Sequence, residues 1–256
     1  MADALIGSTG FVGSNLLRQR PFDECFHSRD IETIRGRSYD LVVCAGVRAE
    51  KWRANREPER DREGIERLSA CLADVHAAHV VLISTVDVYP DPINVDENSA
   101  IEASVASPYG RHRLALEQFI RARFATTTVR LPGLFGHGLK KNVIFDLLND
   151  NALDAICPDS IYQFYGLHRL WRDVETVRAH GLPLVNFATE PLSVRDLARE
   201  AFGVPFENPA PVAPVRYDVR TRYDTVFGGR GGYLCSQAQV QDAIRLFVAQ
   251  SRTGAL

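Results

Sequence analysis

A side chain that could transfer a proton and one that carries a permanent positive charge lie one helical turn apart in the stretch SPYGRHRLALEQF, residues 107–119. Tyr109 has a hydroxyl that can give or take a proton, and Arg113 carries a permanent positive charge. A tyrosine with a pKa of about 10 ionises near neutral pH only beside a positive charge. Residues four apart share one helix face, so the arginine charge is expected to lie beside the tyrosine. A surface helix with an incidental tyrosine and arginine is the alternative.

A glycine-rich stretch near the N-terminus, LIGSTGFVG, contains Gly7, Gly10 and Gly13. Glycines allow a tight turn and let backbone N–H groups approach a diphosphate, to which the start of a helix adds favourable partial charge. The stretch follows a strand-like run and precedes an amphipathic helix. It therefore predicts a dinucleotide site, and a purely structural turn is the alternative.

Apolar runs alternate with helix-like patterns in the first half of the chain. The expected strands are residues 4–6, 24–27, 41–44, 80–84 and 127–131, and the main expected helices after the first are about 61–73 and 109–123. Continuous apolar strands between amphipathic helices predict a parallel sheet covered on both faces. The predicted fold class is α/β, a doubly wound parallel sheet of the Rossmann type with a small C-terminal substrate lobe.

After Gly136 the pattern loosens. It predicts helices at 142–148 and 170–180, strands in IYQFYGL and LVNFA, a capped helix from Ser193, a proline-rich extended connection at 206–218, and a last helix near Ser236. We expect a dinucleotide-binding core at 1–135, with 166–189 returning to it. Residues 136–165 and 190–256 would form the small substrate-binding lobe.

Composition excludes several classes of protein. The 256 residues carry a formal net charge of -2, which gives no sign of a partner such as nucleic acid or a membrane surface. No segment has 18 apolar residues without charge, and the five cysteines show no metal spacing. We expect a cytoplasmic protein with reduced thiols and no metal site.

Only Lys51, Lys140 and Lys141 are lysines among 30 basic residues, so an arginine in place of a lysine is less surprising here.

Five motifs in order carry a resemblance to a known family. The glycine pattern, DLVVCAG, VVLISTVDVY, SPYGRHR and VRLPGLFG together resemble the extended short-chain dehydrogenase/reductases, the NAD-dependent epimerase/dehydratase family that acts on nucleotide sugars. The resemblance covers residues 1 to about 136, and more loosely LWRDVETV and TEPLSVRDLA. It implies that Thr85 bonds the reacting sugar oxygen and that Tyr109 is the general acid/base. Arg113 stands where the family has a lysine, so the charge is kept but a proton relay through that residue is not.

The resemblance also implies a set of cofactor contacts. They are Gly7, Thr9, Gly10, Phe11, Val12, Ser28, Arg29, Cys44, Ala45, Gly46, Ser84, Tyr109, Arg113, Pro132 and Leu134. The family's NAD-selecting carboxylate is absent after the second strand, where Ser28 and Arg29 could bind a 2′-phosphate. We therefore predict NADP(H), with NAD as the alternative, since Asp30 could serve a ribose hydroxyl.

Substrate contacts are expected from Asp87, Asn142, Lys140 and Arg220. The family's 4,6-dehydratases resemble one another in a Thr-Asp-Glu-Val-Tyr run, whereas TVDVY has Val86 in the first acidic position, which argues against dehydration. For Asp87 a turn-capping role is equally open, as are solvent exposure for Lys140 and a surface salt bridge for Arg220.

The predicted function is an NAD(P)-dependent oxidoreductase or epimerase acting on a nucleotide-linked sugar. The short region between the second and third strands is similar to that of dTDP-4-dehydrorhamnose reductases, which favours a keto-sugar reductase. An epimerase that retains NAD and a non-catalytic NADP(H)-binding sensor or scaffold are the alternatives. The resemblance also implies a possible homodimer through the helix that contains Tyr109.

Overall fold

The computed structural model describes residues 2–209 and 213–254, which form two compact units. The first unit comprises residues 2–91, 98–130 and 170–185, and the second comprises 92–97, 131–169 and the described residues from 186. The proline-rich connection predicted at 206–218 lies partly outside the described residues.

The first unit is built on a six-stranded sheet with the order β10-β6-β4-β3-β1-β2. The strands are β1 (Asp3–Ile6), β2 (Glu24–Phe26), β3 (Ser38–Cys44), β4 (His76–Thr85), β6 (Thr126–Leu131) and β10 (Leu184–Asn186). β1 pairs in parallel with both β2 and β3, and β3 pairs in parallel with β4. The chain thus reverses its direction of travel across the sheet between β1 and β3, which is where open α/β sheets bind ligands.

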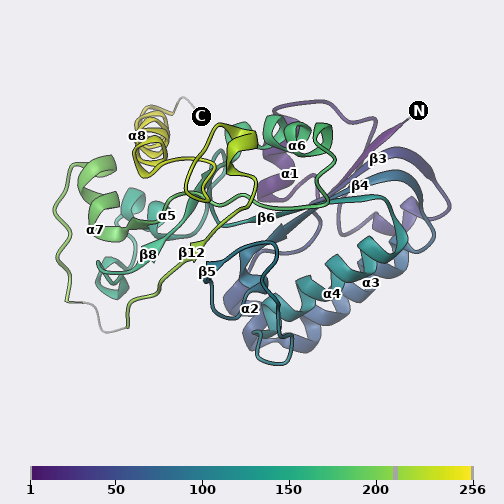
Figure 1. Cartoon of the computed structure of the whole chain (residues 1–256), viewed down its shortest axis with the longest axis horizontal. Coiled ribbons are helices and arrows are strands. Elements are labelled where there is room, and N and C mark those ends of the chain that lie inside the picture. The colour runs from purple at the N-terminus through teal and green to yellow at the C-terminus, as the bar shows by residue number, and fades with distance from the viewer. Residues whose placement is uncertain (1, 210–212, 255–256) are drawn as a thin grey trace. The chain divides into compact units, whose positions relative to one another are not determined.

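Helices cover both faces of this sheet (Figure 1). They are α1 (Phe11–Leu17), α2 (Lys51–Arg56), α3 (Pro58–Leu72), α4 (Pro108–Arg123) and α6 (Leu170–Ala179), with short 3-10 turns η1 (Ile31–Ile34) and η2 (Val86–Val88). Figure 1 shows α3 and α4 on one face and α1 and α6 on the other. Ile65 and Leu68 of α3 and Leu116 and Ile120 of α4 are buried with Val42 and Val80 of the sheet. The α/β fold and doubly wound parallel sheet predicted from the sequence are confirmed.

The second unit contains only short elements apart from its last helix. They are β5 (Ile93–Val95), β7 (Gly133–Phe135), α5 (Val143–Asn149), η3 (Leu153–Ala155), β8 (Ile161–Tyr162), β9 (Phe164–Gly166), η4 (Leu167–Arg169), β11 (Leu192–Ser193), α7 (Val194–Leu197), the π-helix η5 (Ala198–Phe202), β12 (Asp218–Val219), η6 (Asp224–Phe227) and α8 (Gln237–Thr253). Three two-stranded sheets pair β7 with β9, β8 with β11 and β5 with β12. Phe247 of α8 packs on Phe135 of β7, with ring centroids 5.7 Å apart.

Two sequence expectations about elements were wrong in detail. The single strand expected in IYQFYGL is two strands, because the buried Gln163 between them turns its side chain to the backbone of Thr189 and Val219. The helix expected from about Asp61 begins at Pro58, and the preceding segment forms the additional helix α2. Proline is favoured at the first position of a helix, where its missing N–H costs nothing.

Candidate active site in the first unit

The glycine-rich turn is packed too closely for side chains. Gly7 has φ +89°, and a Cβ there would lie 2.3 Å from the carbonyl oxygen of Ala45, just after β3. A Cβ on Gly13 would lie 2.1 Å from the carbonyl oxygen of Gly7. The Gly7 N–H donates to the carbonyl of Phe26 at 2.7 Å, which joins the turn to the end of β2. The ends of β1, β2 and β3 therefore meet at this turn.

Most of the predicted cofactor contacts of the first unit lie around this turn. Gly10 is the extended N-cap of α1 and no side chain caps the helix, so its first N–H groups lie beside the open turn. Thr9 and Gly10 are exposed, and Phe11 and Val12 begin the helix. Cys44 ends β3, and Ala45 and Gly46 follow it. Backbone N–H groups of this kind can bind a diphosphate.

In the turn after β2, the predicted phosphate-binding residue Arg29 is exposed. Ser28 and Arg29 are exposed, and no ion pair joins Arg29 to any residue within 2–209 or 213–254. Asp30 instead accepts a hydrogen bond from the His27 N–H at 2.7 Å, and its carboxylate lies 3.3 Å from Nε2 of the same histidine. The carboxylate that could serve a ribose is thus held within the turn.

Tyr109 lies in the first turn of α4, which begins at Pro108 after the N-cap Ser107. Its backbone N–H donates to Oδ1 of Asn55 on α2 at 3.0 Å, and the residue is 6% exposed. Burial raises the pKa of Tyr109, and the nearby Arg113 only partly opposes that effect. The hydroxyl therefore keeps its proton at neutral pH.

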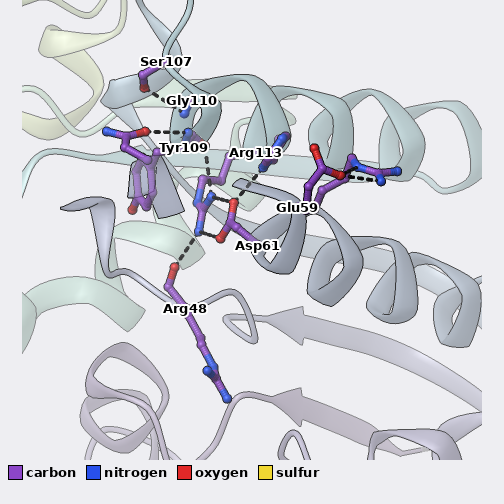
Figure 2. A network of polar contacts seen from close by, with 10 residues as sticks. Arg48, Glu59, Asp61, Ser107, Tyr109, Gly110 and Arg113 are labelled. Atoms are coloured by element: carbon purple, nitrogen blue, oxygen red, sulfur yellow. Dashed lines mark hydrogen bonds and ion pairs between the residues drawn. The ribbon is translucent and has the colours of Figure 1, made fainter. Parts of the chain in front are cut away.

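Arg113 is bound on several sides (Figure 2). Its guanidinium donates to both carboxylate oxygens of Asp61 on α3, at 2.6 and 2.9 Å, and to the backbone carbonyls of Arg48 at 2.6 Å and Tyr109 at 3.0 Å. The guanidinium carbon also lies 3.7 Å from the centroid of the Tyr109 ring. The predicted Tyr–Arg proximity exists, but Asp61 balances the arginine charge.

Asp61 also contacts a second residue of α4. Nδ1 of the buried His112 lies 2.8 Å from the carboxylate. Burial raises the pKa of Asp61, but hydrogen bonds from Arg113 and His112 outweigh that effect and hold the pKa below its usual range. The carboxylate is therefore the ionised centre of a largely buried cluster between α3 and α4.

Thr85 is the last residue of β4, and Asp87 lies in η2, which follows it. The Thr85 hydroxyl accepts from the Asp87 N–H at 3.1 Å and so caps η2. The Asp87 carboxylate pairs with the ammonium of Lys51 on α2 at 2.7 Å. A Cβ on Gly110 would lie 2.1 Å from the Asp87 carbonyl oxygen, so η2 and the first turn of α4 are in direct contact. This contact brings Thr85 and Tyr109 onto adjoining elements.

Ser84, a predicted cofactor contact, also has a partner within the protein. Its hydroxyl donates to Glu117 of α4 at 2.5 Å, and Glu117 forms a buried ion pair with Arg130 at 2.6 Å. Arg130 also donates to the hydroxyl of Tyr89 at 2.8 Å. This network joins β4, β6 and α4, where its charges are paired within the protein.

The remaining predicted residues belong to the second unit. Asn142 caps α5 by accepting from the Ile144 N–H at 3.0 Å, and its amide donates to the carbonyl of Leu134 at 2.8 Å. Lys140 is exposed, whereas Arg220 pairs with Asp218 at 3.1 Å. Pro132 and Leu134 lie immediately before and within β7.

Sequence reasoning missed Lys51, Asn55 and Asp61, all in or beside α2 and α3. Their partners are 36 to 54 residues away in sequence, so no local spacing indicates the contacts. The rarity of lysine in the chain is the one sequence signal that could have drawn attention to Lys51. In the described residues no three potential ligands gather as a metal site, and no helix has the length and apolar character to cross a bilayer.

Neither a protein-family model nor a curated protein sequence matches the chain. Solved structures do match over nearly the whole length. An NAD-dependent NDP-hexosamine 5,6-dehydratase of tunicamycin biosynthesis is 20% identical, with a TM-score of 0.72 over 99% of this chain and 98% of its own. A dTDP-4-dehydrorhamnose reductase from Clostridium acetobutylicum is 16% identical, with a TM-score of 0.75 over 98% of this chain and 100% of its own.

A third similar structure is a UDP-N-acetylglucosamine 4-epimerase from Methanobrevibacter ruminantium in complex with UDP-N-acetylmuramic acid. It is 12% identical, with a TM-score of 0.75 over 99% of this chain and 98% of its own. The chain shares the fold of these nucleotide-sugar enzymes, as the sequence resemblance predicted. Because a dehydratase, a reductase and an epimerase match about equally well, the fold does not select the reaction.

Proposed function

We propose that this protein is an NAD(P)-dependent oxidoreductase or epimerase of a nucleotide-linked sugar, and specifically a keto-sugar reductase. The observation that carries the proposal is the contact between η2 and α4 at the carboxyl end of β4, where Thr85 caps η2 and Tyr109 lies in the first turn of α4. In parallel α/β sheets this end of the strands is where ligands bind.

In the proposed reduction, the Thr85 hydroxyl hydrogen-bonds the carbonyl oxygen of the keto-sugar. Tyr109 gives its hydroxyl proton to the same oxygen, and its raised pKa suits a donor that is protonated at neutral pH. The bound dinucleotide supplies the hydride for the carbonyl carbon. Proton and hydride together convert the ketone to an alcohol, and the tyrosine regains its proton from solvent.

The proposed cofactor is NADP(H), held by the glycine-rich turn and by Ser28 and Arg29. An exposed guanidinium without an ion pair among the described residues suits a 2′-phosphate. Asp30, the acidic alternative for a ribose hydroxyl, is already engaged by His27. NAD is the alternative, because the similar 5,6-dehydratase is NAD-dependent.

A nucleotide sugar is the proposed substrate, as in the complex of the similar epimerase with UDP-N-acetylmuramic acid. Asp87 adjoins Thr85, and Lys140 is exposed and able to meet a diphosphate. Asn142 and Arg220 have structural partners within the second unit, so their proposed substrate contacts would be additional to those roles.

We also propose a homodimer in which α3 and α4 of the two subunits form a polar interface. On the outer face of α3, Arg62 pairs with Glu59 and Glu66, both at 2.7 Å. Within the described residues, the exposed large apolar side chains lie outside α3 and α4. Such an interface would depend on charge, so its dissociation should respond to salt.

Two other functions are alternatives to the reductase. An epimerase that retains NAD uses the same Thr85 and Tyr109. One observation favours a non-catalytic NADP(H)-binding sensor or scaffold. The Arg113 guanidinium is paired with Asp61, so its charge is not fully available to a cofactor or to Tyr109.

The first test is the identity of any nucleotide that the purified protein retains, measured by native mass spectrometry. NADPH and NADH titrations follow on emptied protein, and then a screen of nucleotide-linked keto-sugars. Reversible NADPH binding with keto-sugar turnover supports the reductase. Tightly retained NAD(H) supports the epimerase, and no binding of either dinucleotide rejects the proposal.

Two variants separate catalysis from binding. Tyr109→Phe removes the proton donor and should abolish turnover with cofactor affinity nearly unchanged. Turnover by that variant would reject the proton-transfer role. Arg113→Lys distinguishes an adapted arginine, whose replacement lowers the rate, from a degraded site, in which lysine raises it.

A further inference from the structure

The charge of Arg113 is fixed by its surroundings. The residue is 4% exposed, its guanidinium binds both oxygens of Asp61, and an arginine does not lose its proton in proteins. It can therefore influence Tyr109 only as a constant charge that Asp61 largely balances. A positive charge beside Tyr109 that is not already balanced by Asp61 must come from another residue.

Helix α2 brings such a residue to the site. Asn55 accepts the hydrogen bond from the Tyr109 N–H at 3.0 Å, which fixes one face of α2 against the start of α4. Lys51 lies four residues before Asn55 and hence on the same face of the helix. Its side chain is 45% exposed.

The ammonium of Lys51 is held by Asp87 at 2.7 Å. Asp87 in turn donates its N–H to Thr85, and its carbonyl oxygen is the atom that packs against Gly110, next to Tyr109. Lys51 thus meets both candidate catalytic elements, η2 through Asp87 and the start of α4 through its own helix.

These contacts lead us to propose that Lys51, positioned by Asp87, is the second cation of the Tyr109 site and the one that tunes the hydroxyl during proton transfer. The proposal rests on the proton-transfer role of Tyr109 proposed above. Lys51 is a positioning residue, since it acts through Asp87 and through its charge. An ammonium supplied from α2 would replace the function of a lysine at the position of Arg113.

Three charged groups act on Tyr109, and a fourth, Asp61, is paired with one of them. Arg113 comes from its own helix, Asp61 reaches it through Arg113 from α3, Lys51 comes from α2 and Asp87 from η2. After burial, which raises the pKa of Tyr109, and Arg113, which lowers it, Asp87 raises that pKa and Lys51 lowers it. The two members of the Lys51–Asp87 pair therefore act in opposite directions.

The test measures the titration of Tyr109 without substrate. The protein is labelled with 3-fluorotyrosine, whose hydroxyl is more acidic than that of tyrosine, and fluorine NMR follows each signal against pH. Tyr109→Phe identifies its signal among those of the eight tyrosines. Lys51→Met should raise the titration midpoint of residue 109, Asp87→Asn should lower it, and the double variant should fall between the two.

Matched controls separate charge from folding. Arg56→Met removes one positive charge from the same helix α2 and should leave the midpoint unchanged. Lys51→Arg keeps the charge and should stay near the wild-type midpoint even if Lys51→Met is poorly folded. The proposal is overturned if Lys51→Met and Arg56→Met shift the midpoint alike, or if Lys51→Arg behaves as Lys51→Met.

The titration result does not depend on finding a substrate. If no keto-sugar is turned over but the midpoints move as expected, the proposed function fails while Lys51 still tunes Tyr109. If turnover is found but the midpoints do not move, the function stands and the role of Lys51 is rejected.

Discussion

The guanidinium of Arg113 and the carboxylate of Asp61 form a two-point ion pair between α4 and α3, with N–O distances of 2.6 and 2.9 Å. Their side chains are only 4% and 11% exposed. Such a pair is planar and bidentate, a geometry that lysine cannot reproduce. The pairing with Asp61 therefore explains why an arginine, and not a lysine, stands four residues after Tyr109.

Asp61→Asn should lower the free energy of unfolding by about 3 kcal/mol, because it leaves the buried Arg113 charge without its counter-ion. Glu59→Gln is the matched control on the same helix, since its partner Arg62 and Glu59 itself are 49% and 75% exposed. That change should leave the free energy of unfolding nearly unchanged, because an exposed ion pair contributes little to stability. Urea unfolding of both variants measures the difference, and equal losses would show that the Asp61 cluster adds no stability.

The same carboxylate should make stability depend on pH. The pKa of Asp61 is held below its usual range by Arg113 and His112 against the effect of burial, so the folded state binds its proton more weakly than the unfolded state does. Its contribution is complete above the unfolded pKa of about 3.9 and is lost as pH falls through the lower folded pKa. Urea midpoints between pH 6 and pH 3 should fall less steeply for Asp61→Asn than for the wild type; parallel curves would contradict this assignment.

The parts of the site that the sequence predicted are those with local signals. Gly7 and Gly13 lie where a strand gives way to a helix, and Tyr109 follows the cap Ser107 and Pro108, so short-range pattern and turn chemistry placed them correctly on their elements. The strands of the parallel sheet were recognisable because both of their faces are buried, which leaves continuous apolar runs such as Leu41–Cys44.

The parts that the sequence did not predict depend on packing between distant elements. Lys51 meets Asp87 only because α2 packs on the start of α4, and Ser84 turns to Glu117 only because α4 covers β4. Neither spacing nor residue type carries that information. The sequence alone therefore does not show that Ser84 has a hydrogen-bond partner on the facing helix.

The close approach of α4 to η2 predicts that Gly110→Ala is harmful. Its Cβ would lie 2.1 Å from the Asp87 carbonyl oxygen, so the two elements must separate, at a cost of about 1–3 kcal/mol. Gly64 lies on the exposed face of α3, and a Cβ there would have no atom within 4 Å. Gly64→Ala should therefore raise the free energy of unfolding by about 0.5–1 kcal/mol. Thermal unfolding compares the two, and a stable Gly110→Ala variant would contradict the direct contact between these elements.

The exposed guanidinium of Arg29 predicts cofactor selectivity that can be measured without any substrate. Arg29→Ala should weaken NADPH binding about tenfold, since a charge-assisted hydrogen bond to the 2′-phosphate contributes roughly 1.5 kcal/mol at least. NADH binding should stay unchanged, because NADH lacks that phosphate. Stability should also stay unchanged, as no ion pair joins Arg29 to the part of the chain that the structure describes.

Arg18→Ala is the matched control for this measurement. Arg18 is an exposed cation at the opposite end of α1 from the glycine-rich turn, so its removal changes the net charge equally without touching the proposed phosphate contact. Calorimetric titrations of both variants with both dinucleotides separate local contact from general charge. If both changes weaken NADPH binding equally, the effect comes from net charge and not from a contact of Arg29. If Arg29→Ala weakens the binding of NADPH and NADH equally, Arg29 does not select NADP(H).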